Sequence, residues 1–132
     1  MTTKTTTQPP GIWNPGEHLF AQCTVVTNPT RTVYLAGQTS IDENGDIIGV
    51  GDVETQIRTS FANIATILAH VGGTIEDVAK ITAYFVDMAA LPVYTQVLGE
   101  LFPKVRPSQT VVEVVRLAMP ELLVEIDATA VL

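Results

Sequence analysis

Residues 52–73 read DVETQIRTSFANIATILAHVGG, and they carry the strongest structural signal in the chain. Apolar residues recur there every three or four positions, the spacing that lines up side chains along one face of an α-helix. They are Val53, Ile57, Phe61, Ile64, Leu68 and Val71. Asp52 is a typical N-cap residue, and Gly72 and Gly73 can end the helix in the left-handed conformation. The pattern predicts an amphipathic helix with one buried face.

Segments with strand character lie on both sides of this helix. They span residues 19–27, 31–36, 79–86, 109–117 and 122–131. The first two are separated by the turn sequence Asn28-Pro29-Thr30 and are expected to form a hairpin or meander. A second helix is expected after Asp87, with Pro92 in its first turn, where proline is tolerated. The predicted order is β-β-(β)-α-β-α-β-β, an α+β fold with two helices on one face of a mixed sheet.

The face of the sheet without helices is predicted to be half polar. It would carry Thr82, Tyr84, Glu125, Asp127 and either Val112 or Glu113. Such faces can meet around a symmetry axis, which predicts a closed cyclic oligomer with the helices outside. The other interpretation is a monomer with one solvated sheet face. Because only 16% of the residues are charged and 46% are hydrophobic, cover by partner subunits is an attractive explanation.

Length and composition narrow the class of protein. With 132 residues the chain is expected to form a single domain, residues 17–132, after a flexible or loosely docked arm, residues 1–16. A net charge of -7 argues against a nucleic-acid partner. The apolar runs are far shorter than the ~20 residues of a membrane span. The single Cys23 and the absence of a signal-peptide pattern favour a cytoplasmic protein.

Few residues stand in patterns that imply chemistry. His18 and His70 lack metal-ligand spacing, so no metal site is expected. Glu125 lies on a strand whose opposite face is apolar, and in an oligomer it would be an enclosed carboxyl suited to carry protons; otherwise it is an ordinary rim carboxylate. The loop over residues 104–109 offers cation and amide donors that could hold a small carboxylate, or it is a solvated connection.

Several blocks of sequence together resemble a known family. They are Leu35-Ala36-Gly37-Gln38, Asp52 to Gln56, Asn63, Gly72-Gly73, Asp77 to Lys80, Asp87-Met88 and Val124 to Ala128. In this order they make the chain, from about Phe20 to Val131, similar to the Rid family, also called YjgF. The resemblance implies a chorismate-mutase-like fold and a homotrimer with small-molecule clefts between subunits. It also implies hydrolysis of imine and enamine intermediates to a keto acid and ammonia, without metal or organic cofactor.

The resemblance also assigns site residues. Glu125 matches the glutamate that orders the attacking water and is the candidate catalytic residue. Gly37 matches a glycine whose backbone lines the pocket. Gln109 stands where the family has an arginine that grips the substrate carboxylate. Losing such a charged fork costs roughly 1.5–3 kcal/mol of binding.

Three further pocket positions differ from the family pattern. Phe20 stands in place of a tyrosine, Ala36 in place of a serine and Thr95 in place of an asparagine. Arg106 would replace the missing cation only if its loop folded the guanidinium back into the cleft. Two functions are therefore compared: a deaminase-type hydrolase with an altered pocket, and a trimer that binds a small metabolite without turning it over. A weaker third is an accessory subunit of another enzyme.

Overall fold

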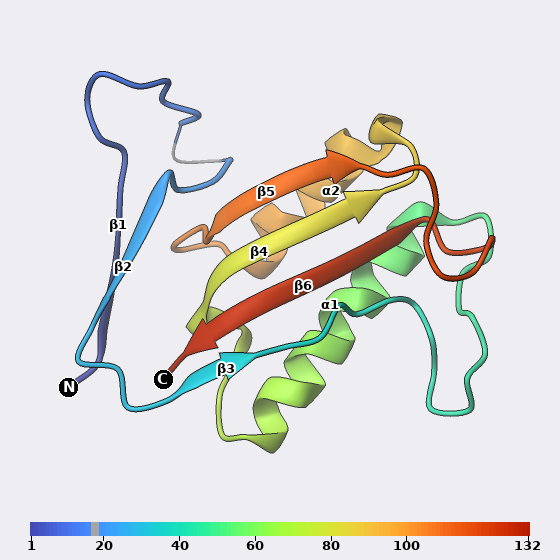
Figure 1. Cartoon of the computed structure of the whole chain (residues 1–132), viewed down its shortest axis with the longest axis horizontal. Coiled ribbons are helices and arrows are strands. Elements are labelled where there is room, and N and C mark those ends of the chain that lie inside the picture. The colour runs from blue at the N-terminus through green and yellow to red at the C-terminus, as the bar shows by residue number, and fades with distance from the viewer. Residues whose placement is uncertain (17–18) are drawn as a thin grey trace.

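A four-stranded mixed sheet with two helices on one face forms the body of the molecule (Figure 1). The structure is a computed structural model, and it describes residues 1–16 and 19–132. The strand order is β3 (Thr32–Tyr34), β6 (Val124–Val131), β4 (Val78–Phe85), β5 (Ser108–Glu113). β6 runs antiparallel to both neighbours, whereas β4 and β5 are parallel. The predicted α+β architecture is thus confirmed.

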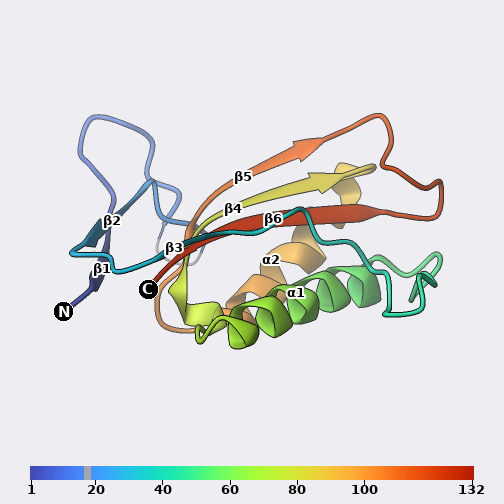
Figure 2. The same cartoon turned by 60° about the horizontal axis from the view of Figure 1, so that its bottom comes forward.

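The first helix begins where the sequence predicts, whereas Asp87 caps a 3₁₀ turn and the second α-helix begins four residues later, at Leu91. α1 (Val53–His70) is capped by the Asp52 carboxylate, which accepts a hydrogen bond from the Thr55 amide at 3.1 Å. Gly72 has a φ of +86°, which suits glycine at a helix end. A 3₁₀ turn, η1 (Ile75–Asp77), leads into β4, and a second, η2 (Met88–Ala90), precedes α2 (Leu91–Leu101). The helices lie side by side on the same face of the sheet (Figure 2).

The core lies between the helices and this face of the sheet. Strand residues alternate between buried and partly exposed along β6, because successive side chains of a strand point to opposite faces. The largest buried side chains include Ile57, Phe61, Ile64, Leu68, Ile81, Phe85, Tyr94, Leu98 and Ile126. Each contributes about 1.5–3 kcal/mol through loss of apolar surface from water. The core therefore fixes which residues of each strand face the helices.

The N-terminal region differs from the sequence prediction. β1 (Thr3–Thr7) lies within the arm expected over residues 1–16 and pairs antiparallel with β2 (Cys23–Thr27). The predicted hairpin between residues 19–27 and 31–36 does not form, because β2 pairs with β1 while β3 pairs with β6. A local turn signal cannot reveal such distant partners. The predicted domain start at residue 17, and His18, lie outside the described residues.

Among residues 1–16 and 19–132, no helix is long and apolar enough to cross a membrane.

Candidate functional site

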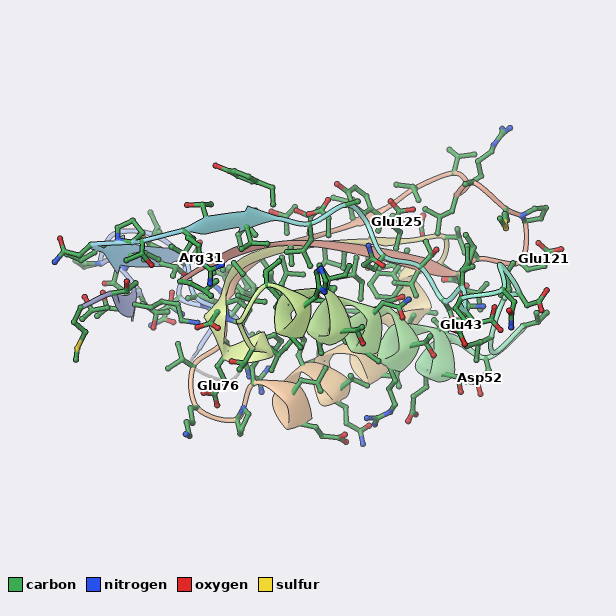
Figure 3. The ribbon with its side chains drawn as sticks, turned by 90° about the horizontal axis from the view of Figure 1, so that it is seen from below. Arg31, Glu43, Asp52, Glu76, Glu121 and Glu125 are labelled. Atoms are coloured by element: carbon green, nitrogen blue, oxygen red, sulfur yellow. The ribbon has the colours of Figure 1, made fainter. Side chains whose placement is uncertain are left out.

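The pairing of the strands separates the candidate site residues onto two faces of the sheet. Residues that are directly paired in a sheet share a face. Gln109 pairs with the buried Ile81, so it lies on the helix-covered face. Glu125 pairs with Tyr84 on the open face, away from α1 and α2 (Figure 3). Within one chain these two residues therefore belong to different half-sites.

The first half-site, the carboxylate half-site, consists of Glu125, Gly37, Tyr84 and Asp127. The chain beyond β3 continues beside β6, where Gln38 and Ile126 exchange backbone hydrogen bonds of 2.7 and 2.9 Å. This places Gly37 directly under the half-buried Glu125 side chain. A Cβ at position 37 would lie 2.9 Å from the Glu125 Cδ atom and closer still to Oε2. The carboxylate thus occupies space that only a glycine leaves open.

Two further polar side chains adjoin Glu125 on the open face. The Tyr84 hydroxyl donates a hydrogen bond of 3.1 Å to Asp127 Oδ2. This bond, together with slight burial and the negative charges of Asp127 and Glu125, raises the pKa of Tyr84. The phenol therefore stays protonated and remains a donor beside two carboxylates. The Gly37 amide makes no hydrogen bond to the described residues, so its N–H is a further donor at this place.

The second half-site, the amide half-site, is a cavity at the edge of the sheet between β5, α2 and the N-terminal region. Its volume is about 300 Å³. It is lined by Trp13, Leu19, Phe20, Leu91, Thr95, Gln109 and Val111. Three residues that the family resemblance assigned to the pocket, Phe20, Thr95 and Gln109, thus meet in one cavity. Apart from Gln109 and Thr95 its walls are apolar, which suits a small ligand with few charges.

The Gln109 side chain is held by a buried tyrosine of α2. The Tyr94 hydroxyl donates a hydrogen bond of 3.0 Å to Gln109 Oε1. Tyr94 is fully buried, and burial raises its pKa well above the ordinary value, so it donates at any working pH. Because Oε1 already accepts the bond from Tyr94, the part of the Gln109 amide that remains for a ligand is the donor Nε2. The Thr95 hydroxyl is already bonded to the Leu91 carbonyl at 3.0 Å.

Two candidate residues lie elsewhere. Ala36 is exposed next to Gly37 and has no side chain that could bond a ligand. The Arg106 guanidinium rests against Gly99 of α2 and lines a separate cavity on the other side of Phe20. It is not among the residues that line the cavity of Gln109. The cation therefore lies near the amide half-site without lining it.

The rest of the open face is neither core nor ordinary surface. Val112, rather than Glu113, lies on it, since Glu113 pairs with the buried Phe85 and accepts a bond of 2.9 Å from the Met88 amide. Tyr34 is 81% exposed there. Among residues 1–16 and 19–132, no group of three His, Cys, Asp or Glu side chains could hold a metal ion. The polar groups described at the two half-sites are the side chains of Glu125, Tyr84, Asp127, Gln109 and Thr95 and the Gly37 amide.

Tyr84, Tyr94 and Gly99 acquired no role from the sequence. Tyr94 lies in the second helix, and nothing in the sequence indicates that its hydroxyl has a partner on β5. Gly99 carries no turn signal in its helix. Hydrophobic periodicity sorts residues by face but carries no information on hydrogen bonds between elements, so these roles follow only from the three-dimensional arrangement.

With the two half-sites defined, comparison with known proteins gives the class. Residues 17–132 match the family described as Endoribonuclease L-PSP. The chain is 36% identical over 104 residues to 3-aminoacrylate deaminase RutC of Acinetobacter baylyi, covering 79% of this chain and 82% of the relative. The chain therefore belongs to the Rid (YjgF) family.

Two further relatives agree with this assignment. A RutC family protein of Pyrococcus horikoshii is 37% identical over 98 residues, covering 74% of this chain and 77% of that protein. A crystal structure of YyfB from Yersinia pestis, described as a Rid family protein of unknown function, has a TM-score of 0.88 at 29% identity and covers 98% of both chains. The fold predicted from the family resemblance is confirmed.

Proposed function

We propose that this protein is a deaminase-type hydrolase that acts on a small imine or enamine in a cleft between the subunits of a homotrimer. The observation that carries the proposal is the separation of Glu125 and Gln109 onto opposite faces of one sheet. A second copy that covers the open face would bring its amide half-site to the carboxylate half-site of the first. The half-polar open face, with Tyr34 81% exposed, supports such cover.

The reaction requires a water and a proton carrier. For 3-aminoacrylate, the substrate in the name of one relative, protonation of C2, the carbon next to the carboxylate, by a proton from solvent gives an iminium ion at C3. Water then adds to the C=N carbon, and the C–N bond breaks to release ammonia while the new hydroxyl group loses its proton and becomes the aldehyde oxygen. Glu125 would take the proton from the attacking water and return one to the leaving nitrogen. Gly37 N–H would hold the substrate beside it.

The altered amide half-site would favour a less anionic substrate. Gln109 offers one neutral donor in place of a charged fork, and the cavity around it is largely apolar. A neutral hydrogen bond contributes about half as much as a charge-assisted one. A substrate whose carboxylate is absent or esterified loses less binding affinity from the change of arginine to Gln109 than a substrate with a free carboxylate does. Neutral enamines should therefore be tested beside 3-aminoacrylate.

The deciding experiment compares ammonia release by the native protein with that of Glu125→Gln. We expect the variant to lose about 100-fold or more of the enzyme-dependent rate, because a positioned general base contributes 10²–10⁴-fold. Glu43→Gln, which makes the same chemical change at an exposed turn, is the matched control and should retain the native rate. Ammonia release that persists unchanged in Glu125→Gln would refute the proposed role.

The second candidate is a small-metabolite-binding trimer without turnover. The Tyr94 bond to Gln109 favours it, because it fixes a neutral group where the family has a cation. A ligand that binds only the folded protein raises its melting temperature by mass action. Thermal stabilisation by an enamine, with no ammonia released from that compound, would select this function over the hydrolase.

The proposal includes a trimeric, cytoplasmic protein without a nucleic-acid partner. The net charge of -7 disfavours phosphate backbones, despite the endoribonuclease description of the family. Sedimentation should give a particle of three chains, each of 14.2 kDa. A particle of one chain at the concentrations used in the activity assay would contradict the proposed trimer and the proposed cleft between subunits.

A further inference from the structure

A further cavity in the described part of the chain adjoins the amide half-site, with which it shares Phe20. It has a volume of about 570 Å³ and lies between the N-terminal region and the loop before β5. Its lining residues are Thr6, Thr7, Gln8, Asn14, Phe20, Ala21, Lys104, Val105 and Arg106. Among these residues, all from the described ranges 1–16 and 19–132, two are cationic and none is acidic. In a chain with 14 acidic and 7 basic residues, a cavity with this lining is unusual and calls for an anionic occupant.

Arg106 is built into this cavity rather than left on the surface. Its Nη2 atom lies 2.9 Å from the position that a Cβ of Gly99 would occupy, so the guanidinium packs directly over the backbone of α2. Nη1 is buried and has no hydrogen-bond partner among residues 1–16 and 19–132. Leaving a charged donor unpaired is costly. Burial also lowers the pKa of Arg106.

The opposite wall of the cavity is held in a defined position. Gln8 Nε2 donates to the Phe20 carbonyl at 2.8 Å, and Gln8 Oε1 accepts from the Gln22 amide at 3.0 Å. These bonds fasten β1 to the segment before β2. Thr6 and Thr7, the last two residues of β1, also line the cavity. Because successive side chains of a strand point to opposite faces, only one of the two can turn its hydroxyl into the cavity, and it would be a neutral donor beside Arg106.

Lys104 contributes charge at the mouth of the cavity. Its ammonium lies 3.9 Å from Glu76 Oε1, and its side chain is 81% exposed. An exposed pair at this distance contributes little. Lys104 therefore attracts an anion toward the cavity, while Arg106 offers the buried donor.

We propose that this cavity binds a small oxyanion, a carboxylate or phosphate group, with Arg106 as its principal ligand. The guanidinium fork matches the two oxygens of either group. A threonine hydroxyl of β1 would add one neutral hydrogen bond. The site shares Phe20 with the amide half-site but differs from it in its polar groups, because Gln109 does not line it and Glu125 lies on the other face of the sheet.

The test is isothermal titration calorimetry on the full chain with two probes, inorganic phosphate and succinate. We expect at least one of them to bind, and Arg106→Gln to weaken that binding about 10- to 100-fold. The charge-matched control is Arg116→Gln, which removes a cation outside the cavity and should leave the affinity within twofold. Which probe binds tells a carboxylate ligand from a phosphate ligand.

Further variants separate this site from the proposed active site. Gln109→Leu should leave oxyanion binding unchanged, so failure of the hydrolase proposal does not remove this one. Lys104→Gln, at an exposed position that folding does not require, should weaken binding only a few-fold. The proposal is overturned if neither probe binds the native protein, or if Arg106→Gln and Arg116→Gln reduce affinity equally. A change of oligomeric state in Arg106→Gln without oxyanion binding would also overturn it, and would assign the cavity to a carboxylate of a second copy.

Discussion

Two glycines in this protein, Gly37 and Gly99, each leave space for a charged group from another element. We expect the two regions to respond differently when the glycine is replaced by alanine. At Gly37 a carboxylate from β6 lies over the backbone beyond β3, on the open face of the sheet. At Gly99 a guanidinium from the loop before β5 lies over the backbone of α2. In both places a missing Cβ determines where a charge rests. Neither glycine has a positive φ, so space rather than backbone conformation explains the residue.

The difference lies in how freely each charge can move away. Glu125 is short and starts from a central strand that is paired on both sides, so its carboxylate has few other positions. Arg106 has a long, flexible side chain on a loop, and only its far end approaches Gly99. A group placed by a strand is positioned by the whole sheet, whereas a group placed by a loop is positioned by the cavity around it. The first arrangement suits chemistry that needs fixed distances, and the second suits binding.

Gly37→Ala should have the largest effect on activity. The new methyl group would overlap the Glu125 carboxylate and displace it, and a displacement of about 1 Å can reduce a rate about 100-fold. Ammonia release measures this loss. Adding Glu125→Gln to the same chain should cause little further loss, because both changes remove one function. Full additivity of the two losses would show that Gly37 does not act through Glu125.

Gly99→Ala should separate binding from stability. Alanine in a helix interior is about 0.5–1 kcal/mol more favourable than glycine, and the flexible end of Arg106 can move aside. We therefore expect the melting temperature to stay level or rise, while oxyanion affinity falls several-fold. Calorimetric titration and thermal unfolding of the same sample check both. A fall in melting temperature with unchanged affinity would contradict this account.

The smallest effect concerns an ordinary surface pair that joins α1 and α2. Arg58 donates a 2.8 Å hydrogen bond to Glu100, and this bond lowers the pKa of Glu100. A lowered pKa means that the stabilisation is present above the unfolded-state pKa and is lost as pH falls through the folded-state value. Thermal unfolding of native protein and Glu100→Gln should differ slightly at pH 7 and converge in acid. A difference in melting temperature that grows as the pH falls would contradict the lowered pKa of Glu100.

Much of the fold could be predicted from the sequence because the signals were local. The apolar stripe from Ile57 to Leu68, the caps at Asp52 and Gly72, and the alternation from Val124 to Val131 each depend on a few neighbouring residues. The pairing of β1 with β2 could not be predicted, since a threonine-rich segment has strand propensity but no alternation that names a partner. The same limit caused the incorrect hairpin.

The candidate site was predictable in residue type but not in arrangement. The family resemblance pointed to Glu125, Gly37 and Gln109, and the structure places the first two together. That Gln109 lies on the other face follows from its pairing with Ile81, which is a property of the sheet. The role of Tyr94 as the donor to Gln109 depends on how α2 crosses β5, which no local pattern encodes.

The placement of the two half-sites on opposite faces has a consequence for how such a protein can diverge. Because the pleat of the sheet keeps the surroundings of Gln109 and Glu125 apart, a substitution at position 109 can change which ligand is recognised without changing the packing around Glu125. Substrate specificity and catalytic chemistry can then evolve independently, and a duplicated gene could acquire a new substrate while its reaction stays the same.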